Sequence, residues 1–480
     1  MGASHHRAFS PPPASHAAAD DLTVPERLLH ERVRSLFSLD FLRSVLTQGR
    51  DDLRDSKLSA PVVAVLLLTF VTERLPSLLN VLDKARAGLV SGLPALSASR
   101  QAFSQRLLAL GHAPFLRLLR ETTRRLSSAE HTRPWITPLA PFARGIYAVD
   151  DTTLEALVRR VDWLRVFARG EPQLLAGKLG GVIDLSTGKL AEVLYNSDSA
   201  ANEKSHIRPL LASFPAGALF VLDLGYFAYP FFDWMTKRGW YFVTRLRHGA
   251  TYEVLQVLAD RPLYRDRIVA LGAYRADRAA RPVRLVELLL DGVWCSYLTN
   301  VLDPEQLPAD AVWRLYQERW TIEMCFAALK RALGLASLRC STTEGVLAQI
   351  WTTLTIYQVL QDLRLELAAA AGLGADDISW TNLMRHIAWY IEQPEGKPPL
   401  RTWLKDNATQ FALAKRGTRP RRARQLAPEV LASLREPKAA LDPTVLHARR
   451  PRQGKPGPVR PSIITVAGLR TSTRLDEVGR

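Results

Sequence analysis

A predicted helix over residues 308–335 carries four polar side chains whose types and spacing suit work on a charged substrate. They are Tyr316, Arg319, Glu323 and Lys330. At about 100° per residue, these four fall within one stripe roughly 60° wide. The stripe borders the apolar stripe of the helix instead of lying opposite it, as polar groups at the edge of a cleft would. The alternative is an ordinary amphipathic helix with an i,i+4 ion pair between Arg319 and Glu323.

A second candidate is Asp223, which closes the apolar run ALFVLD and precedes Leu-Gly-Tyr. An unbroken apolar run is typical of a strand buried on both faces. A carboxylate at the carboxyl end of such a strand lies where α/β folds place their sites. The alternative is an aspartate that begins a turn before Gly225.

A third candidate is Asp151, one of two adjacent aspartates that follow the predicted strand GIYAV. We choose Asp151 because it abuts Thr152 and Thr153. Alternation along a strand puts Asp150 on the opposite face, so only one of the pair can point into a site. The alternative is a cap or turn residue, since Thr152 and Glu155 have the spacing of a capping box.

Two strand-end aspartates and a helical glutamate suit a pair of hard divalent cations about 3.5–4 Å apart. Such a pair activates a water or a 3′-hydroxyl and stabilises the leaving oxygen of an in-line phosphoryl transfer. The composition agrees, because 64 Lys and Arg against 47 Asp and Glu give a net charge of +17 and a pI near 10.0. Such a surplus favours a polyanionic partner, nucleic acid first.

At these residues the chain resembles the insertion-sequence transposases of family four, which carry an aspartate, aspartate, glutamate triad on a ribonuclease-H-like fold. The family's helix signature is Tyr, two residues, Arg, three residues, Glu, six residues, Lys, and YQERWTIEMCFAALK matches it at 316–330. The two aspartate motifs are matched by DTT at 151–153 and by DLGY at 223–226. Looser matches are FVTRLR, which contains Arg245, and YLTN before the helix.

The resemblance implies that Asp151, Asp223 and Glu323 hold two Mg²⁺ ions, for which Mn²⁺ substitutes. It also implies contacts with double-stranded DNA, namely the inverted-repeat ends of a transposon and the target, and a homodimer on that DNA. The DNA-contacting residues it implies in the core are Tyr316, Arg319, Lys330 and Arg245. Some relatives cut through a hairpin and hold a flipped base on tryptophan, for which Trp294 and Trp320 are the candidates; the alternative is that both are buried aromatics.

The predicted fold class is α/β: a ribonuclease-H-like catalytic core with a β-rich insertion, flanked by an all-helical N-terminal region and a helical and basic C-terminal region. Strand patterns begin at Gly145, with a hairpin at STGK, and return as Val- and Leu-rich runs between residues 246 and 302. The predicted division is a disordered tail (1–22), a helical DNA-binding region (23–135), the first part of the core (136–245), the insertion (246–302), the second part of the core (303–370), C-terminal helices (371–414) and a basic arm (415–480).

The basic arm has 13 Lys or Arg against three Asp or Glu between residues 415 and 460. Its run KRGTRPRRAR is either a phosphate-binding arm or a solubilising tail, and we favour the arm. The residues it would use are Lys415, Arg416, Arg421 and Arg422.

Three cysteines without a CxxC pair predict neither a disulfide framework nor a zinc site. No apolar run is long enough to span a bilayer and no signal peptide is apparent, so we expect a bacterial cytoplasmic, nucleoid-associated enzyme without membrane contact. Two other functions stay open. They are a nuclease of the same fold without strand transfer and a non-catalytic DNA-binding relic of a transposase.

Overall fold

A computed structural model describes most of the chain between Leu39 and Leu446. The described residues are 39–46, 57–73, 75–90, 93–126, 132–154, 177–196, 203–273, 275–335, 338, 340, 342–383, 385–386, 398, 400–407 and 425–446. The expected tail at 1–22, Glu155 of the possible capping box and the basic run at 415–424 lie outside these residues.

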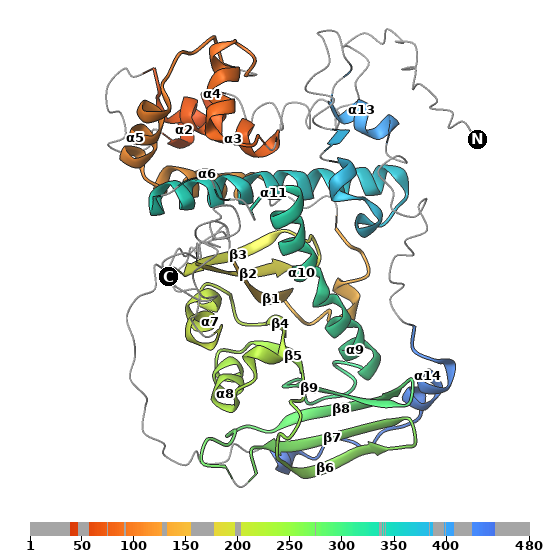
Figure 1. Ribbon diagram of the computed structural model, residues 1–480. Helices are drawn as coiled ribbons and strands as arrows, with labels where there is room; N and C mark the ends of the chain where they lie inside the picture. Colours follow the sequence, from red (N-terminus) through yellow and green to blue (C-terminus); the bar gives the residue numbers. More distant parts are fainter. Residues whose placement is uncertain are drawn as a thin grey trace, which may run out of the picture.

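One nine-stranded sheet organises the molecule, in the order β3-β2-β1-β4-β5-β9-β8-β7-β6 (Figure 1). The strands are β1 (Gly145–Thr153), β2 (Lys178–Asp184), β3 (Leu190–Asn196), β4 (Ala218–Leu222), β5 (Tyr241–Arg245), β6 (Tyr252–Asp260), β7 (Tyr264–Leu271), β8 (Val283–Leu290) and β9 (Val293–Thr299). The first five strands form the core half of this sheet, and the last four form the insertion half.

The core half mixes both strand directions. Strands β1, β2 and β3 are antiparallel neighbours, whereas β4 and β5 run parallel to β1. The β2–β3 connection is the hairpin that the STGK sequence predicts, with Gly188 at φ +66°, a left-handed conformation that glycine adopts without strain. This α/β core confirms the predicted ribonuclease-H-like fold class.

The insertion half is an antiparallel meander. Strands β6 to β9 pair in sequence order, and β9 also pairs with β5 of the core half. The insertion therefore extends the core sheet edge to edge, and its strands fall within the range 246–302 expected from the sequence.

Different helices cover the two faces of the core half. Helices α7 (Glu203–Leu211) and α8 (Tyr229–Lys237) pack on one face, and α9 (Ala309–Glu318) and α10 (Trp320–Ala327) on the other (Figure 1). The expected single helix at 308–335 is thus interrupted. It breaks at Arg319 and passes into a π-helical turn, η4 (Ala328–Ala332). Such turns are rare and are frequently found at functional sites.

A long helix, α11 (Thr343–Ala371), crosses between the sheet and the N-terminal helices (Figure 1). The Thr342 side chain caps its first turn, and Gly372 at φ +65° ends it. It is buried on nearly all sides, which explains its lack of an amphipathic pattern. The N-terminal helices are α2 (Leu39–Leu46), α3 (Ala60–Thr72), α4 (Leu78–Arg86), α5 (Arg100–Leu110) and α6 (Ala113–Arg125). No helix among the described residues has both the length and the apolar character needed to span a membrane.

The remaining helices come from the C-terminal part of the chain. Helix α13 (Leu400–Asp406) stands near α11, while α14 (Pro428–Arg435) and the turn η8 (Pro443–Leu446) lie along the insertion. Arg261, at the β6–β7 turn, donates to the carbonyl oxygens of Ser433 and Pro437. Part of the region expected as a basic arm is therefore a packed segment attached to the insertion. The shorter turns are η1 (Thr137–Leu139), η3 (Leu224–Tyr226) and η5 (Ala375–Asp377).

Candidate active site

The register of two parallel strands brings two aspartates together. Val149 of β1 is the partner of Leu222 of β4, so Asp150 and Asp223 follow at neighbouring positions. In β1, Ile146 and Ala148 belong to the core that includes α10, whereas Tyr147 and Val149 belong to the core under α7 and α8. Alternation therefore places Asp150 on the α10 face.

Helix α10 brings the third carboxylate to the same face. Arg319, at the junction of α9 and α10, lies between two carboxylates: its Nη2 is 2.7 Å from Glu323 Oε1, and its Nη1 is 3.5 Å from Asp223 Oδ1. The i,i+4 ion pair within the helix is present, as the alternative interpretation of the sequence expected. Because the same guanidinium also faces Asp223, this ion pair joins the helix to the strand end.

The electrostatics of this face centre on Asp150. Burial, opposed by a hydrogen bond from the Asp151 backbone N–H and reinforced by the nearby Asp223 carboxylate, raises the pKa of Asp150 to about 7. The Arg319 guanidinium acts in the opposite direction but does not cancel the shift. Burial disfavours the charged form of a carboxyl group, and a neighbouring carboxylate adds to that effect.

Asp151 does not join these residues, which corrects the choice made from the sequence. Its carboxylate is on the opposite face of β1, 2.6 Å from His206 Nε2 of α7, and it accepts a hydrogen bond of 3.0 Å from the Tyr226 hydroxyl. The expectation that Asp150 and Asp151 point to opposite faces is met, but the residue beside Asp223 is Asp150. Adjacency to Thr152 does not decide which face a strand residue takes; the pairing with β4 does.

Tyr316 and Arg245 lie close to the carboxylates, as expected. The Tyr316 ring stands 5.4 Å from the ring of Tyr297 on β9, and the Arg319 guanidinium lies 5.8 Å from it. Burial raises the pKa of Tyr316, and the charges of Arg319, Asp223 and Arg245 also act on it. Arg245 ends β5 with an exposed side chain.

Lys330, Trp320 and Trp294 lie in three different environments. Lys330 lies in the π-helical turn, so the angle computed for one uninterrupted α-helix does not apply to it. Trp320 is 47% exposed at the start of α10, near Glu323, so it is not a buried aromatic. Trp294 stacks with Arg265, with the guanidinium 4.2 Å from the ring, and both residues belong to the insertion.

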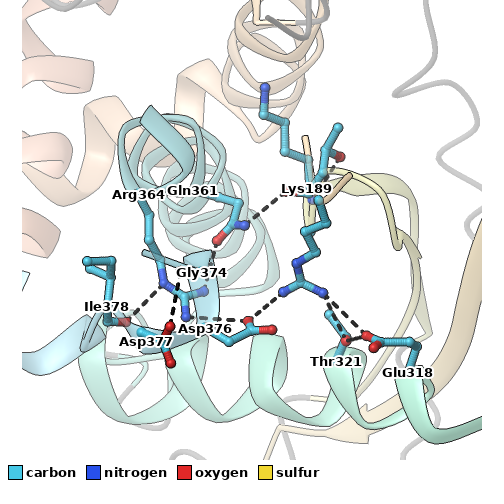
Figure 2. A network of polar contacts seen from close by, with 12 residues as sticks. Lys189, Glu318, Thr321, Gln361, Arg364, Gly374, Asp376, Asp377 and Ile378 are labelled. Atoms are coloured by element: carbon cyan, nitrogen blue, oxygen red, sulfur yellow. Dashed lines mark hydrogen bonds and ion pairs between the residues drawn. The ribbon is translucent and has the colours of Figure 1, made fainter. Parts of the chain in front are cut away.

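A buried arginine, Arg133, holds the α9–α10 junction through its contacts with residues on both sides of Arg319. Arg133, only 2% exposed, donates to Thr321 Oγ1 at 3.2 Å and to Asp376 Oδ1 at 2.6 Å, and lies 3.8 Å from Glu318. Figure 2 shows Glu318, Thr321 and Asp376 within this network, and Asp376 also lies 3.6 Å from the Arg364 guanidinium of α11. Glu318 and Thr321 flank Arg319, so the network fixes the helix turn that presents it.

The donor set suits a hard divalent cation. Asp150, Asp223 and Glu323 offer carboxylate oxygens, the ligands that Mg²⁺ and Mn²⁺ prefer. Burial and the neighbouring Asp223 carboxylate raise the pKa of Asp150, and a bound cation would act in the opposite direction. Among the described residues, no three His, Cys, Asp or Glu side chains already stand close enough together to define a metal site by themselves.

Three residues that the structure places around these carboxylates or around Asp151 were not assigned to the site from the sequence: Asp150, which was set aside in favour of Asp151, Arg133 and His206. One signal for Asp150 was available, because the paired glycines of KLGGVID lie opposite the two aspartates, Gly181 across from Asp150 and Gly180 across from Asp151. A Cβ on Gly180 would come within 2.9 Å of Asp151 Oδ1, and one on Gly181 within 3.1 Å of the Phe326 ring of α10. Arg133 and His206 have no local signal, since their partners are distant in the sequence.

Residues 143–359 match the family model described as "Transposase DDE domain". This segment runs from the start of β1 into α11 and includes Asp150, Asp223, Arg319 and Glu323. The segment is therefore similar to transposase DDE domains, the family that the sequence motifs indicate.

Two bacterial proteins with transposase names are similar to this chain. The chain is 24% identical over 219 residues to "Transposase InsG for insertion sequence element IS4" of Escherichia coli K12, covering 43% of this chain and 49% of the relative. It is 25% identical over 154 residues to "Putative transposase y4zB" of Sinorhizobium fredii NGR234, covering 30% of this chain and 42% of the relative. The chain thus spans about half of these relatives or less.

Among solved structures, the chain is similar to that of the piggyBac transposase synaptic complex with hairpin DNA. The TM-score is 0.38 at 10% sequence identity, covering 84% of this chain and 87% of the other.

Proposed function

We propose that this chain, whose residues 143–359 are similar to transposase DDE domains, is a DNA transposase that cleaves DNA at transposon ends and transfers the 3′-hydroxyl ends into target DNA. The observation that carries the proposal is the position of three carboxylates. Asp150 of β1 and Asp223, directly after β4, lie at neighbouring positions of two parallel strands. Glu323 of α10 pairs with Arg319, whose guanidinium also lies near Asp223. This arrangement meets the requirement of phosphodiester chemistry for several anionic oxygens at one edge of a sheet.

Asp150, Asp223 and Glu323 would hold two divalent cations, Mg²⁺ with Mn²⁺ as its substitute. When bound, these ions supply activation of the attacking water or 3′-hydroxyl and stabilisation of the leaving oxygen. Because metal ligands must be deprotonated, Asp150 would hold a cation in its carboxylate form. Arg319 is then the group that turns its planar guanidinium from the carboxylates to a phosphate of the scissile strand.

Tyr316, Lys330 and Arg245 are proposed to contact phosphates beside this strand. Trp320 is preferred over Trp294 as the side chain that stacks on a displaced base, because Trp320 is exposed next to Glu323 whereas Trp294 stacks with Arg265. Two copies of the chain would pair the two ends, and the complex would act at the bacterial nucleoid.

The basic run at Lys415, Arg416, Arg421 and Arg422 is proposed to follow the DNA backbone. Removing the whole C-terminal part of the chain would also remove α14, which packs on the insertion, so neutralising these four side chains is the cleaner test. For every phosphate that the variant no longer neutralises, the slope of log affinity against log salt should fall by about 0.9. An unchanged slope would exclude the run from the DNA interface.

The central test uses the DNA that flanks the coding region. Inverted repeats found there supply end substrates, which are incubated with Mg²⁺ and a target plasmid. The wild-type chain is expected to nick the ends and join them to the plasmid, and Glu323→Gln is expected to bind them without cutting, because a neutral amide is a poor ligand for a hard cation. Cutting without joining would indicate a nuclease, and cutting by Glu323→Gln would refute the site.

A further inference from the structure

The carboxylate of Asp151 lies on the face of the sheet opposite α10, and it is one of the most buried charged groups of the core. Its side chain and that of His206 are each 1% exposed. His206 Nε2 lies 2.6 Å from Asp151 Oδ2, and the Tyr226 hydroxyl donates to Asp151 Oδ1 at 3.0 Å. Both carboxylate oxygens therefore have a partner, contributed by two separate elements, α7 and the turn η3.

Such a group is costly to bury. A carboxylate removed from water needs good geometry and several hydrogen bonds to be tolerated, and an apolar side chain of similar size often fits as well or better. The carboxylate of Asp151 also needs a glycine opposite it. Gly180 of β2 is its strand partner, and a Cβ at that position would come within 2.9 Å of Asp151 Oδ1. These contacts call for a role beyond filling the core.

Tyr226 and Asp151, which share a hydrogen bond, are each also linked through the backbone to one of the proposed ligands, Asp223 and Asp150. Tyr226 ends the 3₁₀ turn that begins directly after Asp223, and its backbone N–H donates to the Asp223 carbonyl oxygen at 3.2 Å. Asp151 follows Asp150, and its backbone N–H donates to Asp150 Oδ1 at 2.8 Å. A single side-chain bond thus closes a loop that runs from Asp150 through Asp151 and Tyr226 to Asp223.

We propose that Asp151, Tyr226 and His206 form a buried brace that sets the separation and orientation of Asp150 and Asp223 from the opposite face of the sheet. The three are positioning residues, and none of them touches the reacting atoms. This inference rests on the proposed function, since it assumes that Asp150 and Asp223 hold divalent cations. It assigns a role to the tyrosine of DLGY and to the second aspartate of DDTT.

The brace is tested on the full chain with Mn²⁺ alone as the probe, by electron paramagnetic resonance titration of free Mn²⁺. Tyr226→Phe removes only the hydroxyl and is expected to weaken Mn²⁺ binding about 10- to 100-fold, the range known for groups that orient metal ligands. His206→Leu should do the same. His206→Gln keeps a donor near Asp151 and should restore binding close to that of the wild type.

Tyr264→Phe is the matched control. Tyr264 is also a fully buried tyrosine whose hydroxyl donates to a buried carboxylate, that of Asp266, but it lies in the insertion. Thermal unfolding of both phenylalanine variants measures the purely structural cost. If the role of Tyr226 were only structural, both variants would be less stable and both would keep wild-type Mn²⁺ affinity, and the brace would be refuted.

The same Mn²⁺ titration distinguishes a failure of the brace from a failure of the proposed metal site. If Asp150→Asn abolishes Mn²⁺ binding while Tyr226→Phe and His206→Leu retain it, the brace is wrong and the metal site stands. If the wild type binds no more Mn²⁺ than Asp150→Asn does, the proposed function fails and the brace fails with it. Weakened binding in Tyr226→Phe together with normal binding in Tyr264→Phe supports both.

Discussion

The two halves of the sheet differ in how their charged groups are paired. In the insertion, Asp266 of β7 and Arg284 of β8 are completely buried and form two hydrogen bonds, of 2.9 Å and 2.7 Å. Tyr264 donates a further hydrogen bond to Asp266, and Arg284 also donates to the carbonyl oxygen of Leu307. One negative charge meets one positive charge, and both groups have several partners.

In the core half the charges do not balance. Asp150, Asp223 and Glu323 share one face, and the guanidinium of Arg319 lies against only two of them. Burial, and to a lesser extent the neighbouring Asp223 carboxylate, raises the pKa of Asp150 to about 7. A buried ion pair with balanced charge and complete hydrogen bonding holds a fold together, whereas a surplus of carboxylates at a strand end prepares a place for cations.

The largest effects should come from the carboxylates of the unbalanced group. Asp150→Asn, Asp223→Asn and Glu323→Gln are expected to lower the cleavage rate by more than about 100-fold, beyond the range caused by outer-shell changes. Gel shifts should show end binding near wild type for all three. Asp151→Asn should instead retain more activity and recover much of the remainder at high Mn²⁺, because it removes a positioning group and leaves the ligands.

The pair Asp150→Asn and Asp151→Asn decides which of the two adjacent aspartates is the metal ligand. Recovery of Asp150→Asn by added Mn²⁺, together with no recovery of Asp151→Asn, would return the first metal ligand to Asp151. Nicking of an end-containing plasmid at a series of Mn²⁺ concentrations provides this comparison.

The balanced pair of the insertion should respond through stability. Arg284→Met leaves the buried Asp266 without its cation and should destabilise the protein by about 3–5 kcal/mol. Adding Asp266→Leu to that variant should recover most of the stability, because a buried pair can be replaced by apolar groups more cheaply than it can be broken. Urea unfolding measures both. A double variant as unstable as the single one would show that the pair is needed for more than charge balance.

Arg319 tests the link between the site and the DNA. Arg319→Lys keeps the positive charge but removes the planar fork that reaches two oxygens at once, so cleavage should fall by about tenfold while folding is retained. Single-turnover cleavage at saturating DNA is the measurement. Wild-type cleavage by this variant would reduce Arg319 to a partner of Glu323 in the helix.

The sequence was sufficient for the elements, and it indicated Asp223 and Glu323, which the structure places on either side of Arg319. Short apolar runs marked the strands, and the spacing in α9 and α10 marked Arg319 and Glu323. It was not sufficient for the choice within Asp150 and Asp151, because the face of a strand residue depends on which neighbour the strand pairs with and in which register. The same limit applies to Lys330, since local spacing does not reveal where an α-helix gives way to a π-helical turn.

The last expected effect is a pH dependence of the stability of the metal-free protein. The pKa of Asp150 is about 7 in the folded chain because of burial and the neighbouring Asp223, whereas an unfolded aspartate titrates near pH 4. Between these values the folded state binds the additional proton, so the contribution of Asp150 to stability is complete below about pH 4 and is lost as the pH rises to about 7. The slope is at most about 1.4 kcal/mol per pH unit.

Asp150→Asn should abolish that slope, because an amide does not titrate. The groups that act on Asp150, namely Asp223, Arg319 and Asp151, remain in the variant, so the difference between the two unfolding profiles isolates the one carboxylate. Urea unfolding at pH values of about 5, 6 and 7, in the presence of a chelator, is the measurement. Identical profiles would show that Asp150 is already ionised in the folded chain at the lowest of these pH values, and the charge imbalance that separates the core from the insertion would then have to be placed on Asp223 and Glu323.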